Sequence, residues 1–180
     1  TPVITARGPE FRDVMAKLNS GLRAAFNLSP SPSVRKSESW TGEDGYKVVV
    51  VSGSGTAAME MVIANRFRSN DLVLVPTNGK FGERVADICN RFCNVKHLKG
   101  EWGRAFDLGE LERQLERKCY EAVLICHNET STGITQDAEA IAEMCARHET
   151  PFILDGITSV GGMPVHPAAW KAEAVVMGAR

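Results

Sequence analysis

The chain has 180 residues, of which 43% are hydrophobic and 24% charged, and its formal net charge is −1. This composition is ordinary for a globular domain with a hydrophobic core. The near-zero charge gives no electrostatic basis for binding nucleic acid or an anionic membrane. No apolar run approaches the roughly 20 residues that span a bilayer, and residues 1–11 lack the apolar core of a signal peptide. We therefore expect a cytoplasmic protein without nucleic-acid or membrane partners.

Segments typical of helices and strands alternate along the chain. Residues 9–26 predict an amphipathic helix, since apolar side chains recur at three- and four-residue steps. Residues 29–45, with several prolines and glycines, predict a loop. Residues 46–51 form a continuous apolar, β-branched run, which is typical of a strand buried on both faces. Further predicted helices cover residues 56–67, 82–92, 107–118 and 135–148, and further strands cover residues 72–75, 95–98, 122–126, 152–154 and 174–177.

Two of the predicted helices begin with capping signals. Asp107 and Glu110 form an Asp-x-x-Glu pattern, in which the first side chain accepts a hydrogen bond from the first turn. Thr135 is the expected N-cap of the last helix, with Asp137 in its first turn. Strands separated by helix-length segments imply right-handed crossovers and a mostly parallel sheet. We therefore predict an α/β fold, a three-layer α/β/α sandwich whose ligands bind at the carboxyl ends of the strands.

The cysteines, an odd and sparse set of five, predict free thiols in a reducing compartment. Cys89 and Cys93 lie four residues apart on a predicted helix and could share a metal ion. No histidine or second cysteine pair accompanies them at ligand spacing, so we interpret them as small buried apolar residues and expect no metal site.

The first candidate site is the glycine-rich segment at residues 52–58, between a predicted strand and a helix. Its glycines allow a close backbone approach to an anion, and Ser54 and Thr56 add hydroxyl donors at a helix N-terminus. The segment also matches the Gly-x-Gly-x-x-Ala dinucleotide fingerprint, which requires an acid at the end of the next strand. Here Asp71 precedes that strand, and residues 76–79 after it contain no carboxylate. The sequence therefore disfavours a dinucleotide site. Two interpretations of the segment remain, a phosphate-binding turn and a plain tight turn.

Three further candidates follow predicted strands or open a helix. Asp155 ends one strand and precedes a glycine, a position suited either to a ligand contact or to a helix N-cap. Residues 127–133 are six polar residues and a glycine after another strand, and they form either a site or a solvated loop. Phe81 lies between two glycines at a helix start, where an aromatic ring either stacks on a planar ligand or joins the core.

Taken in order, these segments resemble class V aminotransferases, pyridoxal-phosphate-dependent enzymes of fold type I, over nearly the whole chain. The alanine–glyoxylate, serine–pyruvate and 2-aminoethylphosphonate–pyruvate aminotransferases are similar in these motifs. The order and spacing of the motifs are more specific than any motif alone. The segments that carry the resemblance are residues 7–14, 53–60, 78–84, 101–103, 127–133 and 155–162.

The resemblance implies a binding site for pyridoxal 5′-phosphate built from four segments. Asp155 would pair with the pyridine nitrogen and keep it protonated, which makes the ring an electron sink, so Asp155 is the predicted catalytic residue. The other implied contacts are Ser54, Gly55 and Thr56 to the phosphate, Phe81 and Ile157 to the two ring faces, and Thr130 to the ring hydroxyl.

The family's covalent lysine has no counterpart in the printed sequence. It usually follows a strand like residues 174–179 in a Gly-Ser-Gln-Lys context, but here Arg180 stands at that point, and Lys171 precedes the strand. We expect residues 1–180 to be an incomplete large domain, with a degenerate, non-catalytic domain as the alternative. We expect the intact protein to transfer an amino group from a small amino acid, such as alanine or serine, to pyruvate or glyoxylate. A 2-aminoethylphosphonate–pyruvate transaminase is the alternative.

The family also implies a homodimer with shared active sites. A loop at residues 29–45 carries Trp40, and aromatic residues are enriched at the cores of protein interfaces. A flexible surface loop explains the same pattern equally well. We predict that Trp40 lies at a subunit contact.

Overall fold

The computed structural model describes residues 8–30 and 43–179. It divides into two compact units, residues 1–51 and residues 52–180. Trp40 lies outside the described residues, so its place at a subunit contact stays a prediction. None of the helices in the described ranges is both long and apolar enough to cross a membrane.

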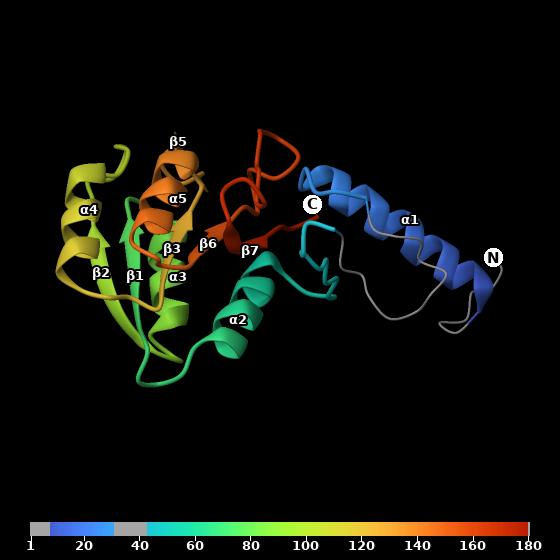
Figure 1. Cartoon of the computed structure of the whole chain (residues 1–180), viewed down its shortest axis with the longest axis horizontal. Helices are drawn as coiled ribbons and strands as arrows, with labels where there is room; N and C mark the ends of the chain where they lie inside the picture. The colour runs from blue at the N-terminus through green and yellow to red at the C-terminus, as the bar shows by residue number, and fades with distance from the viewer. Residues whose placement is uncertain (1–7, 31–42, 180) are drawn as a thin grey trace. The chain divides into compact units, whose positions relative to one another are not determined.

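The larger unit is built on a parallel sheet of five strands in the order β2-β1-β3-β6-β7 (Figure 1). Every neighbouring pair in this sheet runs parallel, so the carboxyl ends of all five strands lie at one edge. This arrangement confirms the predicted α/β class. The strands are β1 (Leu72–Thr77), β2 (Asn94–Lys99), β3 (Ala122–Cys126), β6 (Phe152–Asp155) and β7 (Ala172–Val176).

Helices cover both faces of the sheet, as the predicted three-layer sandwich requires (Figure 1). On one face, α2 (Gly55–Arg66) and α3 (Lys80–Cys89) contact each other and the strands. On the opposite face, α4 (Leu108–Arg117) and α5 (Ala138–Arg147) contact each other. Each sheet face is therefore shielded from water by two helices.

Both faces of the strands are apolar, because successive side chains of a strand point to opposite sides. Val73, Val75 and Ile153 are buried in one cluster with Ile63 of α2 and Val85 of α3. This two-sided burial explains why these strands appear in the sequence as continuous apolar runs. The intervening strand residues are buried as well, among them Leu74, Val123, Ile125 and Leu154.

The prediction of a buried strand at residues 46–51 is wrong. Residues 48–51 lie outside every helix and strand, and Val49, Val50 and Val51 are exposed. β-branched side chains favour a strand only where a neighbouring strand completes the hydrogen-bond ladder and covers the side chains. No described strand pairs with residues 48–51, so the apolar run alone does not produce a strand here.

One predicted helix start is also wrong, and the other is confirmed. Thr135 belongs to β5 (Ile134–Thr135), which pairs antiparallel with β4 (Asn128–Glu129). Asp137 caps α5 instead, because the hairpin holds the chain extended through Thr135. Asp107 caps α4 as predicted, with Oδ1 accepting a first-turn N–H at 3.1 Å.

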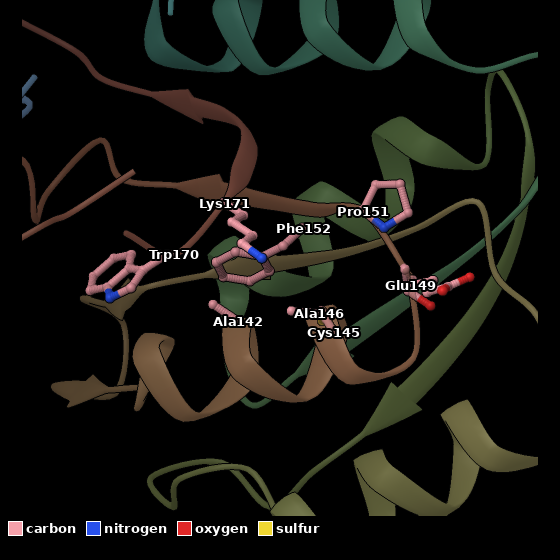
Figure 2. Close-up of a pocket in the computed structure, with 9 residues that line it drawn as sticks. Ala142, Cys145, Ala146, Glu149, Pro151, Phe152, Trp170 and Lys171 are labelled. Atoms are coloured by element: carbon pink, nitrogen blue, oxygen red, sulfur yellow. The ribbon is translucent and has the colours of Figure 1, made fainter. Parts of the chain in front are cut away.

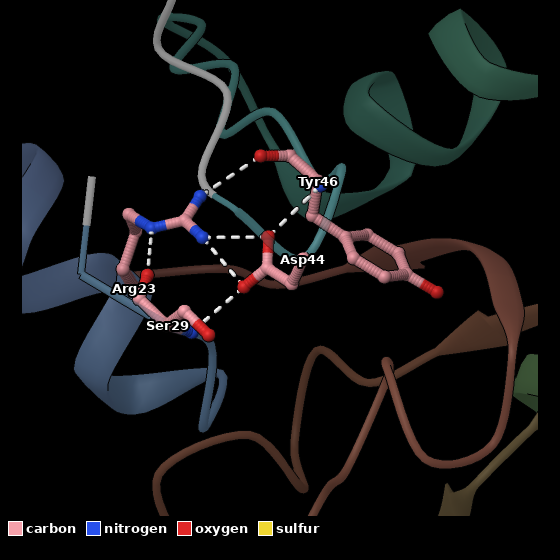
Figure 3. Close-up of polar contacts among 4 residues, drawn as sticks. All are labelled: Arg23, Ser29, Asp44 and Tyr46. Atoms are coloured by element: carbon pink, nitrogen blue, oxygen red, sulfur yellow. Dashed lines mark hydrogen bonds and ion pairs between the residues drawn. The ribbon is translucent and has the colours of Figure 1, made fainter. Parts of the chain in front are cut away.

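The smaller unit contains α1 (Pro9–Ala25), which confirms the first predicted helix. Arg23 in its last turn is 1% exposed, and its guanidinium binds the segments that follow the helix (Figure 3). Nη2 donates to both carboxylate oxygens of Asp44, at 2.7 and 2.6 Å, and Nη1 donates to Tyr46 O at 2.9 Å. Nε donates to Ser29 O. Polar contacts to one buried cation therefore join these segments to the helix.

Asp44 receives donors from three residues. Burial on its own would raise the pKa of this carboxyl, but hydrogen bonds from Arg23, Tyr46 and Ser29 outweigh burial, and the pKa is lowered. Ser29 N–H donates at 2.7 Å and Tyr46 N–H at 3.0 Å. Because the folded pKa lies below the unfolded one, the stabilisation is complete above the ordinary aspartate pKa of about 3.9 and is lost as the pH falls through the folded value.

Replacing Arg23 with alanine should strongly loosen the smaller unit. The change leaves the Asp44 carboxylate buried without its cation, and breaking a buried pair in this way costs about 3–5 kcal/mol. Amide hydrogen exchange at Ser29 and Tyr46, measured at neutral pH, should become much faster. Arg12→Ala, at an exposed position of the same helix, is the control and should leave both rates unchanged. Wild-type exchange in the Arg23 variant would contradict the role of this ion pair.

Candidate functional site

The carboxyl ends of four neighbouring strands place most of the predicted site residues together. β1, β3, β6 and β7 are consecutive in the sheet, so the segments that follow them lie side by side. Backbone hydrogen bonds continue past the strand ends: His127 N–H donates to Asp155 O at 3.0 Å, and Gly156 N–H donates to Val176 O at 2.9 Å. These bonds hold the segments after β3, β6 and β7 in a fixed relation.

The turn before α2 has the geometry of an anion-binding helix N-terminus. Ser54 is the N-cap, and its Oγ accepts from Ala57 N–H at 3.1 Å. A hydroxyl that accepts one hydrogen bond still has its own proton to donate. The N–H groups of Gly55 and Thr56 lie in the first turn, where the helix offers no carbonyl to accept from them. Together with the helix dipole, these donors favour a bound anion at this end.

Gly55 lies directly against Ile157. A Cβ atom at Gly55 would fall 2.5 Å from Ile157 Cδ1, and a Cβ at Gly178 would fall 3.3 Å from Ile157 Cγ2. The start of α2, the turn after β6 and the segment after β7 therefore meet at the Ile157 side chain. Only a glycine at position 55 allows this approach without a shift of Ile157.

Asp155 ends β6 and is buried, which makes its charge costly unless a partner supplies compensation. Burial raises the pKa of Asp155, and the charge of Glu129 adds to this, while the Ile157 N–H and the charge of Arg84 oppose it. Ile157 N–H donates to Oδ1 at 3.0 Å. Among the described residues this is the one hydrogen bond to the carboxylate, so Oδ2 is available to a ligand.

Phe81 is half-buried in the first turn of α3, and its ring contacts a cation. The Arg84 guanidinium carbon lies 5.0 Å from the centre of the ring. At this distance a cation is attracted to the aromatic face. Arg84 therefore occupies one face of Phe81, and the other face is the one that a planar ligand would use.

The polar segment after β3 contains both buried and exposed residues. His127 is buried, which lowers its pKa, and its ring meets Trp170 edge-on at 5.9 Å. Asn128 Nδ2 donates to Thr158 Oγ1 at 3.2 Å, and Thr158 Oγ1 donates to Asn128 O at 3.0 Å. Thr130 is exposed, so its side chain is accessible from outside the fold.

Glu129 has a structural role that the sequence did not predict. It is fully buried, and its Oε2 accepts from Phe81 N–H at 2.9 Å and Gly82 N–H at 2.8 Å. A sequence signal for this contact exists: Gly79, the N-cap of α3, has no side chain to accept these donors. A helix start without a capping side chain needs an acceptor from elsewhere in the fold.

No lysine in the described ranges stands in for the family's covalent lysine. Lys171 precedes β7 and so lies at the amino end of the sheet, opposite Asp155. Lys80 is exposed and its Nζ lies 3.8 Å from Glu83 Oε2. The described residues also contain no group of three or more metal-ligating side chains, and all five cysteines are free.

A surface pocket lies beside α5 (Figure 2). Phe152, the first residue of β6, faces the small side chains of α5, including Ala142 and Ala146. Lys171 before β7 lines the same pocket. Because both strands begin there, the pocket is at the opposite edge of the sheet from Asp155 and takes no part in the candidate site.

Comparisons with known proteins identify the family of this chain. Residues 35–180 match the family model described as Aminotransferase class-V. The (S)-ureidoglycine–glyoxylate transaminase of Bacillus subtilis is 30% identical over 179 residues, 99% of this chain and 39% of that protein. The alanine–glyoxylate aminotransferase of Rattus norvegicus is 34% identical over 119 residues, 66% of this chain and 29% of that protein. The crystal structure of the alanine–glyoxylate aminotransferase of Nostoc sp. has a TM-score of 0.81 and 32% identity, covering 97% of this chain and 43% of that one.

The parallel five-stranded sheet with helices on both faces has the architecture of fold-type I, pyridoxal-phosphate-dependent aminotransferases. The chain belongs to the class-V aminotransferase family, since the family model covers most of its length. It spans between 29% and 43% of the length of the three proteins just compared.

Asp155→Asn should stabilise the protein in the absence of ligand at neutral pH. The pKa of Asp155 is raised in the folded state. Below the ordinary aspartate pKa of about 3.9 the carboxyl is neutral in both states and its ionisation does not affect stability. As the pH rises through the folded pKa, the buried negative charge destabilises the fold. Asparagine removes the charge and keeps the acceptor for Ile157 N–H. Melting temperatures of the variant and the wild type should converge at low pH and diverge above it. A lower melting temperature for the variant at pH 7 would contradict this account.

Gly55→Ala should destabilise the chain, although alanine is the better helix former. The new methyl group overlaps Ile157, and overpacking of this kind costs about 1–3 kcal/mol. Gly53→Ala is the matched control, because a Cβ there meets only the Ala57 Cβ at 3.4 Å, an ordinary contact. Urea unfolding of both variants measures the difference. Equal stability of the two would show that Ile157 does not pack against α2 in solution.

Proposed function

We propose that this chain forms most of the cofactor-binding domain of an aminotransferase that uses pyridoxal 5′-phosphate. The observation that carries the proposal is Asp155, a buried carboxylate with one oxygen left for a ligand, at the sheet edge where ligands of parallel sheets bind. A protonated ring nitrogen beside Asp155 would compensate its buried charge. The N–H groups at the start of α2, for which the helix itself offers no acceptor, fit the phosphate of the same molecule.

Each of the other predicted residues then has one task. Ser54, Gly55 and Thr56 bind the phosphate through the helix N-terminus. Ile157, held between the start of α2 and the end of β7, supports one ring face. The face of Phe81 opposite Arg84 covers the other, and Thr130 donates to or accepts from the ring hydroxyl.

When bound, pyridoxal 5′-phosphate supplies an electron sink for the negative charge that develops at the substrate's α carbon. The chain's own contribution is electrostatic and positional. Asp155 holds a proton on the ring nitrogen, and the walls formed by Phe81 and Ile157 keep the ring in one plane. Burial of Asp155 strengthens its interaction with the ring nitrogen, because little water competes for the charge.

We propose that the amino group passes from a small amino acid, such as alanine or serine, to glyoxylate or pyruvate. The names of the B. subtilis, rat and Nostoc relatives support glyoxylate as acceptor. A 2-aminoethylphosphonate–pyruvate transaminase is the alternative substrate pair, and a domain that binds without catalysing is the alternative of another class. The encoded sequence after Arg180 distinguishes the enzyme from the binding domain: a lysine within a few residues supports the enzyme, and its absence supports the other.

We further propose that the covalent lysine and the substrate-binding residues lie outside the 180 residues, and that the intact protein is a cytoplasmic homodimer with shared active sites. The similarity of this chain to only part of each relative supports the first point. Analytical ultracentrifugation of the intact protein tests the second, and a fully active monomer would refute it.

Asp155→Ala in the intact protein should lower turnover by about 10²-fold or more, the scale observed when one electrostatic contact to the reacting charge is lost. Its cofactor content should fall much less, because the phosphate contacts near Ser54 remain. Turnover under saturating substrate and cofactor absorbance per subunit are the two measurements. Asp87→Ala, at an exposed position of α3, is the control. Wild-type turnover in the Asp155 variant would refute the assignment.

A further inference from the structure

Glu129 is a buried carboxylate, and hydrogen bonds compensate the cost of burying its charge. It is 0% exposed, and no ion pair joins it to another described residue. A buried charge without a cation needs several donors. Oε2 accepts from the N–H groups of Phe81 and Gly82, at 2.9 and 2.8 Å. Oε1 accepts from Ser131 N–H at 3.1 Å and Ser131 Oγ at 2.5 Å.

The contact is an N-cap supplied from a distant part of the chain. Gly79 stands at the N-cap of α3 and contributes no side-chain acceptor. The Glu129 carboxylate takes that place, where a negative charge also interacts favourably with the helix dipole. A Cβ on Gly79 would fall 2.3 Å from Glu129 Cγ and 2.7 Å from Ser131 Oγ, so the missing side chain is what admits the carboxylate.

The same contacts determine where two predicted cofactor residues stand relative to each other. Thr130 lies between Glu129 and Ser131, and both of these neighbours bind the start of α3. Besides the Glu129 bonds, Ser131 Oγ accepts from Lys80 N–H at 2.9 Å. Phe81 is the next residue of that helix. The backbone that carries Thr130 and the backbone that carries Phe81 are therefore tied together at three amide groups.

We propose that Glu129 is a positioning residue for the cofactor: its carboxylate holds Phe81 and Thr130 at the spacing that clamps the face and the edge of one pyridine ring. The inference rests on the proposed function, since it assumes that this ring binds here. Glu129 does not touch the ring and acts through the two residues it places. Its charge also reaches Asp155 and contributes, after burial, to the raised pKa of that carboxyl.

The test uses the full chain and 4′-deoxypyridoxine 5′-phosphate, a cofactor analogue without the aldehyde that would react with surface lysines. Glu129→Gln keeps the size of the side chain but turns one acceptor oxygen into a donor. The Kd for the analogue should rise about tenfold or more, equivalent to roughly 1.4 kcal/mol. The induced circular dichroism of the analogue's ring band at saturation should also fall, because the ring is no longer held in one orientation.

Glu83→Gln is the matched control. It removes a carboxylate from the same first turn of α3, where Glu83 forms a surface ion pair with Lys80, and binding should be unchanged. Hydrogen exchange at the Phe81 and Gly82 amides reports the cap without any ligand. Faster exchange in Glu129→Gln, with wild-type Kd and ring dichroism, would reduce Glu129 to a helix cap and overturn the proposal.

A milder variant covers the case in which Glu129→Gln does not fold. Ser131→Ala keeps the carboxylate but removes one of its donors and the acceptor for Lys80 N–H. It should weaken binding and ring dichroism in the same direction by a smaller factor, and wild-type values would overturn the proposal. No saturable binding of the analogue to the wild-type chain would instead refute the proposed function, and the inference with it.

Discussion

The parallel pairing of β3 with β6 is the constraint on which the candidate site depends. Its register places Cys126 opposite Asp155, so both strands end at the same level. The His127 N–H then bonds to Asp155 O and extends the pairing one residue beyond the ladder. A shift of one residue would reverse the faces of every side chain in β6 and move the Asp155 carboxylate from the α2–α3 side of the sheet to the other.

Two buried carboxylates at this edge have different surroundings, and the difference separates their roles. Glu129 uses both oxygens to accept from the start of α3 and from Ser131. Asp155 accepts one hydrogen bond, from Ile157 N–H, in the described part of the chain. A carboxylate whose acceptors are satisfied stabilises the fold, whereas one that is buried and incompletely satisfied is suited to a charged ligand. The fold therefore uses both oxygens of Glu129, whereas Asp155 keeps one oxygen for the proposed cofactor contact.

Most of the elements of the larger unit could be predicted from local pattern. Strands with two buried faces appear as short apolar runs, and helices appear as periodic apolar positions with caps such as Asp107. The glycine-rich turn and the acid at the end of a strand indicated Ser54 and Asp155 for the same reason, since a parallel sheet exposes its carboxyl ends to ligands. These inferences need only neighbours in sequence and the period of each element.

Tertiary structure decided what depends on partners distant in sequence. The valines at residues 48–51 have strand propensity, but a strand forms only when another strand pairs with it. Thr135 has a side chain suited to an N-cap, but its backbone pairs with Asn128 in the β4–β5 hairpin. Glu129 caps a helix 48 residues before it in the chain, and only the fold brings the two together. Local periodicity specifies the helices and strands. The hydrogen-bond partners at the carboxyl ends of the strands depend on how several segments pack together, and the sequence of one segment does not contain that information.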